Sequence, residues 1–575
     1  MQEKEGYKTI KTDLLIIGAG GSGLRAAVEA VKAGIKVTIV SKSLLGKAHT
    51  VMAEGGIAAS LGDVDPEDNW KVHFKDTMVE GVYISDWRLV EKLAKEAPDR
   101  VYELERMGAL FDRTPEKKIM QRAFGAHTYR RLCHVGDKTG LELLRTLEDQ
   151  IIHSENVTVL DEIFVTKLVK NKDKVIGAIA LDMKKGEFLA INSKSTIIAG
   201  GGCGRIYEVT SNSWESTGDG IALAFDAGAE VRDMEMIQFH PTGMIWPSGV
   251  RGLLVTEGVR GEGGLLYNTK GERFMLRYSP VKKELDARDV VARAIYNEIK
   301  EGRGTEHGGV YLDISYKGKD FIMKKLPGMY TQFMDFAGVD ITKEKMEVAP
   351  TTHYYMGGIK VDPDTNATNV EGLFAVGEAA SGVHGANRLG GNSLADLLVF
   401  GKYVGESASL YAKEAKEYEI GEKVVMDEIN RIKGFLKKDG INPYTLTEKL
   451  RNTMSENVGI IREENGLKKA LSDIEEIKKD YSKVGIDGSL KFNPGLLQCM
   501  ELYNMFTISE LLVKGAILRK ESRGAHFRSD FPKKDKNWLK NIIFRKNGDK
   551  LESYTSTYPD LPPHLAEILP EEKYE

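Results

Sequence analysis

The stretch Asp13-Leu-Leu-Ile-Ile-Gly-Ala-Gly-Gly-Ser-Gly-Leu24 decides the fold of this 575-residue chain. Its apolar start ends in closely spaced glycines, and a helical pattern to Lys32 and a second apolar run, Lys36 to Val40, follow. A strand, a glycine turn, a helix and a strand in this order are typical of a domain that binds a dinucleotide. The glycines allow a tight turn, close approach of a pyrophosphate and close packing of the helix. We therefore predict an α/β fold with a Rossmann-like domain, whose cofactor glycines are Gly18, Gly20, Gly21 and Gly23.

Length and charge limit the classes of protein to which the chain can belong. A chain of 575 residues is too long for one core and predicts two or three domains. Lys plus Arg number 81 and Asp plus Glu number 85, which gives a net charge of -4. No broad basic surface is therefore available for nucleic acid, and we expect no nucleic-acid partner.

The cysteines and the apolar segments indicate where the chain works. Cys133, Cys203 and Cys499 are far apart and show none of the paired spacings that hold zinc or an iron-sulfur cluster. They form no disulfide framework either, which favours a reducing compartment. No stretch approaches the roughly 20 apolar residues that span a bilayer, and the N-terminus is polar rather than signal-like. We expect no bound metal, and a cytoplasmic chain that can dock peripherally on the cytoplasmic face of a membrane.

Two later segments predict that the chain returns to the nucleotide-binding domain. Ser195 to Ala199 is apolar and ends in three glycines, after which Thr217-Gly-Asp-Gly220 opens a helix. Asp219 at that helix start fits either a charge matched to the helix dipole or a contact to the cofactor. Gly372-Leu-Phe-Ala-Val-Gly-Glu-Ala-Ala380 predicts a buried strand ending at Glu378, a carboxylate placed to accept hydrogen bonds from ribityl hydroxyls. Ser41 stands where an acidic residue often binds the ribose of a nicotinamide cofactor, which favours FAD over NAD.

Several polar motifs carry the residues expected to do chemistry. His49 lies in Lys47-Ala-His-Thr-Val-Met-Ala-Glu-Gly-Gly56, soon after the glycine turn. The other motifs are Gln238-Phe-His-Pro-Thr242, Thr256-Glu-Gly-Val-Arg-Gly-Glu-Gly-Gly264, Ala287-Arg-Asp-Val290, Ala349-Pro-Thr-Thr-His-Tyr-Tyr-Met-Gly-Gly358 and His384-Gly-Ala-Asn-Arg-Leu-Gly-Gly-Asn-Ser-Leu-Ala395. In this order, from about Thr12 to Leu539, the chain resembles the flavoprotein subunits of succinate dehydrogenases and fumarate reductases.

The resemblance implies that the chain binds FAD covalently through His49. In that family the imidazole joins the flavin ring methyl, and the attachment makes the flavin a stronger oxidant. The other residues that the resemblance places at the cofactor are Ser41, Lys42, Thr50, Gly55, Gly56, Val165, Asp219, Glu378, Arg388, Ser393 and Leu394.

The resemblance also implies fumarate or succinate as substrate. Hydride would pass between the flavin N5 and a carbon next to one carboxylate, with proton transfer at the neighbouring carbon. Arg388 is the strongest expected carboxylate ligand, because a guanidinium can hold a carboxylate by two parallel hydrogen bonds. Phe124 is expected either to pack against the substrate or to belong to the core. The remaining implied roles are carboxylate binding by His240, Thr256 and His353, catalysis by His240, proton transfer by Arg288, and a relay to solvent by Glu257 and Arg260.

We expect an FAD-binding domain with an inserted α+β capping domain and a C-terminal helical domain. The capping domain follows from the resemblance, whereas Lys- and Glu-rich helical periodicity from Glu406 to Lys483 indicates the helical domain. The expected limits are 1–241 and 353–405 for the FAD-binding domain, 242–352 for the capping domain, 406–540 for the helical domain, and 541–575 for a tail without a recognised pattern.

An iron-sulfur subunit is the implied electron partner, because the chain has neither cluster ligands nor a c-type haem motif. That subunit could lead to a membrane anchor or to a quinone-linked or thiol-linked partner, and both fumarate reduction and succinate oxidation stay open. Two alternatives share parts of the pattern. An L-aspartate oxidase shares the fold and the carboxylate ligands but lacks the counterpart of His49. A non-catalytic FAD-binding electron-relay subunit shares only the glycines.

Overall fold

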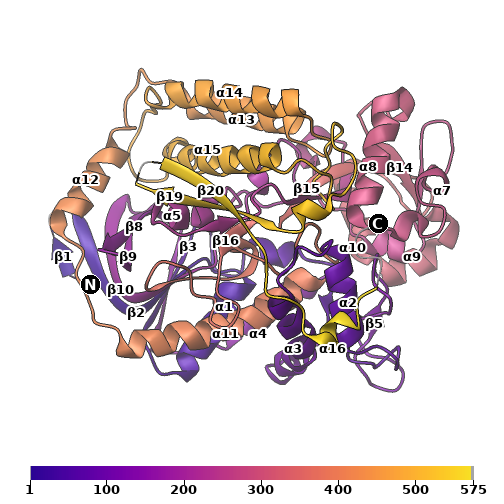
Figure 1. Cartoon of the computed structure of the whole chain (residues 1–575), viewed down its shortest axis with the longest axis horizontal. Coiled ribbons are helices and arrows are strands. Elements are labelled where there is room, and N and C mark those ends of the chain that lie inside the picture. Colours follow the sequence, from indigo (N-terminus) through magenta and orange to yellow (C-terminus); the bar gives the residue numbers. More distant parts are fainter. Residues whose placement is uncertain (1, 5, 549, 571–575) are drawn as a thin grey trace.

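The predicted strand, glycine turn, helix and strand are present in the computed structural model, which describes residues 2–4, 6–548 and 550–570 (Figure 1). They are β2 (Tyr7–Ile17), α1 (Gly21–Lys32) and β3 (Val37–Ser41). β2 and β3 run parallel, with Ile17 beside Val40. The predicted α/β fold is therefore confirmed.

β2 lies inside an eight-stranded sheet. Its parallel part has the order β7 (Val157–Asp161), β3, β2, β10 (Glu187–Ile198) and β17 (Leu373–Ala375). The hairpin of β8 (Ile163–Asn171) and β9 (Lys174–Asp182) joins β10 antiparallel, and β1 (Gln2–Lys4) pairs with β2. Because the carboxyl ends of parallel strands meet at one edge, the residues after β2, β3 and β10 open a common crevice.

The chain between β12 and β15 folds around a core of its own. β12 (Ile237–Met244), β15 (Met346–Tyr355), β14 (Val310–Asp313) and β13 (Leu265–Tyr267) form an antiparallel sheet. It accompanies α8 (Arg288–Glu298), α9 (Lys319–Lys325) and α10 (Pro327–Ala337), the pink region at the right of Figure 1. β12 and β15 cross the expected limits of the capping domain, residues 242 and 352, because these two strands lead the chain into this unit and back out of it. The capping-domain limits stay a prediction.

The helical region contains α12 (Glu422–Lys433), α13 (Pro443–Asn457), α14 (Glu464–Tyr481) and α15 (Pro494–Leu518). The last three lie side by side along the top of Figure 1. The preceding helix α11 (Asn392–Glu414) runs without a break through residues 405 and 406, where we expected a boundary. It ends only at Ala415, whose backbone is extended, so the helical region starts at α12.

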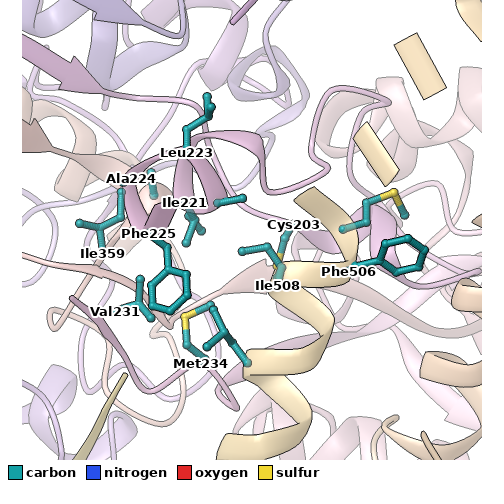
Figure 2. Packing of buried hydrophobic residues seen from close by; sticks show 14 of the residues in the cluster. Cys203, Ile221, Leu223, Ala224, Phe225, Val231, Met234, Ile359, Phe506 and Ile508 are labelled. Atoms are coloured by element: carbon teal, nitrogen blue, oxygen red, sulfur yellow. The ribbon is translucent and has the colours of Figure 1, made fainter. Parts of the chain in front are cut away.

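An apolar contact fixes the helical region to the FAD-binding domain. Figure 2 shows Ile508 of α15 near Cys203, with Ile221 and Phe225 of α5 (Asp219–Asp226) in the same cluster. All four side chains are buried. Burying an apolar side chain of this size contributes roughly 1.5–3 kcal/mol. The contact therefore holds α5 firmly, and α5 begins at the crevice.

Residues 541–548 and 550–570 are folded, although no pattern was recognised in their sequence. β19 (Asn541–Asn547) and β20 (Lys550–Ser556) form a hairpin, and β19 pairs with β11 (Val231–Arg232) in a five-stranded sheet. α16 (Pro563–Ala566) follows, and Leu565 is buried beside Phe74 of α2 (Trp70–Glu80). The segment expected to be a tail therefore forms one edge of a sheet and packs against α2.

Further helices and short strands complete these units. They are η1 (His49–Met52), β4 (Ile57–Ala58), α3 (Trp87–Arg106), β5 (Gln121–Arg122), β6 (Leu132–Cys133), α4 (Thr139–Asp149), α6 (Gly258–Gly261), α7 (Met275–Tyr278), β16 (Gly358–Lys360) and β18 (Ala380–Ser381). Among the residues that the structure describes, no helix combines the length and apolar character needed to cross a membrane.

A buried ion cluster joins the end of α15 to the segment before β12. Arg519 Nε donates to Glu235 Oε1 at 2.6 Å, and the same guanidinium lies 3.2 Å from Asp233 and 3.3 Å from Glu521. Arg519, Glu235 and Glu521 are all fully buried. Removing one partner of such a cluster is costly, because it leaves an uncompensated charge away from water.

We expect Arg519→Ala to lower the free energy of unfolding by about 3–5 kcal/mol. Urea titration followed by helical circular dichroism measures this loss. The matched control is Lys520→Ala at the exposed neighbouring position, which should change stability by no more than about 0.5 kcal/mol. Equal effects of the two variants would show that the cluster does not join the two regions.

Candidate active site

One large cavity collects nearly all the predicted site residues. It runs from the glycine turn to the start of α8 and is bordered by both the FAD-binding and the inserted segments. The predicted residues that line it are Gly18, Gly20, Gly21, Ser41, Lys42, His49, Thr50, Gly55, Gly56, Phe124, Val165, Asp219, His240, Thr256, Glu257, Arg288, His353, Glu378, Arg388, Ser393 and Leu394. Gly23 and Arg260 do not belong to the lining and lie behind it.

The glycine turn shows which glycines the protein itself requires. A Cβ on Gly23 would lie 2.1 Å from the Gly18 carbonyl oxygen, so Gly23 lets α1 pack on β2. A Cβ on Gly20 would meet only Thr50 Oγ1 at 3.4 Å and Ala48 Cβ at 3.8 Å, which are ordinary contacts. The protein therefore has room for a side chain at Gly20, and that space opens into the cavity at the N-terminus of α1. A pyrophosphate fits there, because the first N–H groups of a helix lack partners within the helix.

A buried charged group lies at the other edge of the crevice. Lys42 Nζ lies 2.7 Å from Asp219 and 2.5 Å from Glu501 of α15, and Asn504 Nδ2 donates to Asp219 Oδ1 at 2.7 Å. Asp219 is the first residue of α5 and also lines the cavity, so both of its proposed roles agree with its position. Glu501 was not predicted, because nothing in the sequence near α15 links it to the glycine turn.

His49 lies between two neighbouring polar groups. The Ser213 N–H donates to Nδ1 at 3.2 Å, and Asn212 Nδ2 lies 3.3 Å from Nε2. Burial lowers the pKa of His49 to about 4, so the imidazole is neutral at pH 7. Because Nδ1 accepts from a backbone N–H, the hydrogen of the neutral imidazole lies on Nε2, and Nε2 is the nitrogen left to form a covalent bond.

Two half-buried carboxyl groups also face the cavity. Burial, opposed by a hydrogen bond from the Tyr355 N–H, raises the pKa of Glu378 to about 7. Burial and the neighbouring Asp137 raise the pKa of Glu54 to about 8. Glu54 Oε2 is buried and has no hydrogen-bond partner among the described residues. Glu54 received no role from the sequence, although it directly precedes Gly55 in the His49 motif.

Arg388 and the two histidines gather at the far end of the cavity. The Arg388 guanidinium lies over the Tyr354 ring at 4.5 Å, and its Nε is buried without a partner in the described part of the chain. The His240 and His353 rings are 5.1 Å apart. Burial lowers the pKa of both histidines well below the usual range, and Arg288 adds to the effect. Burial also lowers the pKa of Arg388 to about 9.

Phe124 packs at the same end of the cavity. It is 6% exposed, and a Cβ on Gly390 would come within 2.4 Å of its ring. Its ring also lies 6.0 Å from the Arg288 guanidinium. Phe124 is thus both buried and part of the cavity wall, and the two predicted roles are not exclusive.

Arg288, Glu257 and Arg260 form a connected group. Arg288 Nε donates to Glu257 Oε2 at 2.8 Å, and Arg260 lies 3.8 Å from the same carboxylate. Burial would raise the pKa of Glu257, but Arg288 and Arg260 outweigh it and lower that pKa to about 2. Arg260 is 1% exposed and donates to the Glu284 carbonyl at 2.6 Å. The predicted relay therefore does not reach solvent at Arg260, and the next charged pair outward is Glu284 with Arg273 at 2.6 Å.

Known proteins match both halves of the chain. A family model described as FAD binding domain matches residues 13–394, and one described as fumarate reductase flavoprotein C-term matches residues 447–572. The chain belongs to the succinate dehydrogenase and fumarate reductase flavoprotein family. This flavoprotein is an FAD-dependent oxidoreductase, so the predicted family, enzyme class and use of FAD are confirmed, whereas the covalent attachment through His49 stays a prediction.

Individual relatives cover nearly the whole flavoprotein. It is 46% identical over 535 residues to a subunit of the fumarate reductase (CoM/CoB) of Methanothermobacter marburgensis, across 93% of this chain and 97% of that one. It is 41% identical to the succinate dehydrogenase flavoprotein subunit of Coxiella burnetii, across 93% and 94% of the two chains. A solved E. coli quinol fumarate reductase chain superposes with a TM-score of 0.91 at 35% identity, across 97% of this chain and 98% of that one.

We expect Gly20→Ala to separate cofactor binding from folding in this flavoprotein. The new methyl group fits the protein but occupies the space that opens at the α1 N-terminus, so FAD affinity should fall about tenfold or more, or about 1.4 kcal/mol. Titration of flavin-free protein with FAD measures the affinity, and thermal unfolding measures the stability. In contrast, Gly23→Ala should cost about 1–3 kcal/mol of stability through overpacking. Unchanged FAD affinity in Gly20→Ala would exclude this turn as the phosphate site.

Proposed function

We propose that this flavoprotein interconverts fumarate and succinate and exchanges electrons with an iron-sulfur partner subunit. One observation carries the proposal: Arg288 and Arg388 face a single buried cavity together with His240, His353 and Thr256. Two guanidinium groups suit a molecule with two carboxylates, because charge-assisted bonds to carboxylates are strong and oriented.

Substrate binding falls mainly to Arg388. Its buried, unpartnered Nε can donate to a carboxylate that arrives in the cavity. His353 is fixed at Nδ1, which lies 2.9 Å from Ser211 Oγ, so its Nε2 faces the ligand space. His240, held at Nδ1 by the Thr242 backbone at 2.9 Å, is placed in the same way. Phe124 closes the wall and excludes water, which strengthens these interactions.

FAD, when bound, supplies the hydride acceptor and donor. The residues that would hold it are those of the glycine turn for the phosphates, Asp219 with Lys42 near the adenosine side, and Glu378 for the ribityl hydroxyls. Their positions along one cavity support this assignment.

Arg288 is the residue proposed to move the proton at the substrate carbon next to the one that exchanges hydride. Arginine is a weak acid, with a reference pKa above about 12, so proton loss from it needs support. The Glu257 carboxylate, 2.8 Å from Nε, accepts a hydrogen bond from Arg288 and connects it to Arg260. This arrangement keeps Arg288 fixed and gives it a route for proton exchange.

His49 is proposed to attach FAD covalently through Nε2. Its neutral imidazole and the engaged Nδ1 support this choice of nitrogen. The names of the relatives support the partner, because they describe subunits of larger enzymes, and one of these names includes CoM and CoB. Solved neighbours were studied with UQ1 or with menaquinol, which supports a peripheral membrane position as well.

Anaerobic oxidation of a reduced viologen dye by the purified flavoprotein tests the proposed reaction. Fumarate is the sole acceptor, and an aspartate oxidation assay runs beside it. We expect fumarate-dependent oxidation of the dye. Activity with aspartate instead, or silence with both acids at full flavin occupancy, would overturn the dicarboxylate assignment.

We expect Arg288→Ala to lower kcat for fumarate by about 10²–10⁴-fold, the usual contribution of a general acid. FAD content should stay unchanged, because Arg288 lies at the substrate end. The viologen assay gives kcat, and flavin absorbance gives occupancy. Arg251→Ala, which removes an exposed arginine of the same inserted unit, is the control and should keep full activity. Retained fumarate turnover in Arg288→Ala would rule out its role as proton carrier.

We expect His49→Ala to bind FAD only non-covalently, so that acid precipitation releases its flavin. The unmodified protein should keep its flavin after the same treatment. Succinate oxidation should fall more than fumarate reduction, because loss of the attachment makes the flavin a weaker oxidant. Fluorescence of the precipitated protein detects attached flavin. His153→Ala, an exposed histidine, is the control. Acid-stable flavin in His49→Ala would move the attachment to another residue.

A further inference from the structure

The Arg288 guanidinium is fixed by two acceptors, of which only one belongs to the predicted relay. Nε donates to Glu257 at 2.8 Å, and Nη1 donates to Gln238 Oε1 at 3.1 Å. Gln238 is fully buried in β12. Two hydrogen bonds from different nitrogens fix the guanidinium plane, and Nη2 lies towards Gly390. The direction of Nη2 therefore depends on Gln238 as much as on Glu257.

Gln238 is the first member of a buried chain of amides. Its Nε2 donates to Asn387 Oδ1 at 2.7 Å and to the Arg388 carbonyl at 2.9 Å. Asn387 Nδ2 in turn donates to Glu80 Oε1 at 2.7 Å and to Asp289 Oδ1 at 2.9 Å. These hydrogen-bonded amides thus connect the end of α2, the start of α8, β12 and the Arg388 loop.

The charges at the two ends set the direction of every bond in this chain. Arg288 can only donate, so Gln238 must present its oxygen to Arg288 and its amino group to Asn387. Glu80 and Asp289 accept from Asn387, so Asn387 must present its oxygen to Gln238. Turning either amide over would lose its bonds on both sides. Aligned hydrogen bonds of this kind also strengthen one another.

We propose that Asn387 is a positioning residue that, through Gln238, holds Arg288 in the orientation that proton transfer requires. This inference rests on the proposed fumarate–succinate reaction. Amide groups keep their protons, so the chain orients Arg288 and does not itself conduct protons. Gln238 also contacts the Arg388 carbonyl, and the chain therefore sets the carboxylate ligand and the proton carrier relative to each other.

The far end of the chain is built to hold Asn387 by hydrogen bonds. Asp289 is paired with Arg293 at 2.8 Å, which balances its charge. Burial, with Asp289 adding to it, raises the pKa of Glu80 well above the usual range. A protonated Glu80 still offers Oε1 as an acceptor, so Glu80 does not need its charge to orient Asn387. Glu80→Gln should therefore keep the acceptor oxygen that orients Asn387, whereas Glu80→Ala removes it.

The test compares Asn387→Ala with Asn541→Ala in the full-length, flavin-loaded protein. Asn541 is a matched control: it is a buried amide that donates to Asp233 at 2.6 Å and to a backbone carbonyl at 3.0 Å, but it has no link to Arg288. We expect Asn387→Ala to lower kcat for fumarate about 10- to 100-fold, because small misplacements of a catalytic group have effects of this size. The KM should change by less than about threefold, and the solvent deuterium isotope effect on kcat should rise.

Each outcome separates this inference from the proposed function. An unmodified protein that is silent with fumarate would overturn the proposed function itself. An active unmodified protein, with Asn387→Ala matching Asn541→Ala in kcat and isotope effect, would overturn only the positioning role. Should Asn387→Ala fail to fold, Glu80→Ala and Glu80→Gln test the same row of hydrogen bonds at the end farthest from Arg288. We then expect a lower kcat in Glu80→Ala than in Glu80→Gln, and equal values would contradict the inference.

Discussion

Two guanidinium groups buried against one cavity are the constraint on which the site depends. Arg288 and Arg388 are both nearly inaccessible, and within the described residues only Glu257 bonds directly to either as a carboxylate. Like charges in a poorly solvated space repel strongly. The repulsion contributes to the lowered pKa values of Arg388, His240 and His353, whereas Arg288, together with Arg260, lowers the pKa of Glu257 and keeps it ionised. A dianionic ligand relieves this excess of positive charge, whereas a ligand with an ammonium group adds to it.

This strained arrangement requires a rigid frame, and the frame comes from distant parts of the chain. Arg288 and Glu257 belong to the inserted unit, whereas Arg388 lies in the loop before α11. α2 reaches that loop through Glu80, and α16 near the C-terminus packs on α2. Arg519 closes the frame by joining α15 to the segment before β12. Buried cations that repel can stay at fixed positions only because such contacts oppose their separation.

The parts of the protein that could be predicted from the sequence are those encoded by a short, continuous motif. The glycine turn, the strand before Glu378 and the polar motifs can each be recognised within about a dozen residues, and their site residues line one cavity. The strand before Glu378 ends at Ala375, earlier than predicted, and Glu378 lies in the short 3-10 helix that follows. The contacts of Glu501 with Lys42 and of β19 with β11 join residues far apart in sequence, and no local pattern encodes such pairings. Gln238 and Asn387 lie inside quoted motifs, but their role is visible only from their partners. The domain limit expected between residues 405 and 406 falls inside α11, because the change of composition there does not coincide with the end of a helix.

The direction of the reaction is set away from the substrate. In the proposed reaction, Arg288, Arg388 and the two histidines would stabilise the same transition state whichever way it is crossed, and would therefore accelerate both directions equally. A bias between reduction and oxidation must come from the potential of the flavin and from the partner that supplies or removes electrons. Within this chain, the residues that could bias the reaction towards reduction or oxidation are therefore those at the His49 end of the cavity, where Asn212 and Ser213 also lie. Substitutions there should shift the ratio of the two activities, whereas substitutions at Arg288 should lower both together.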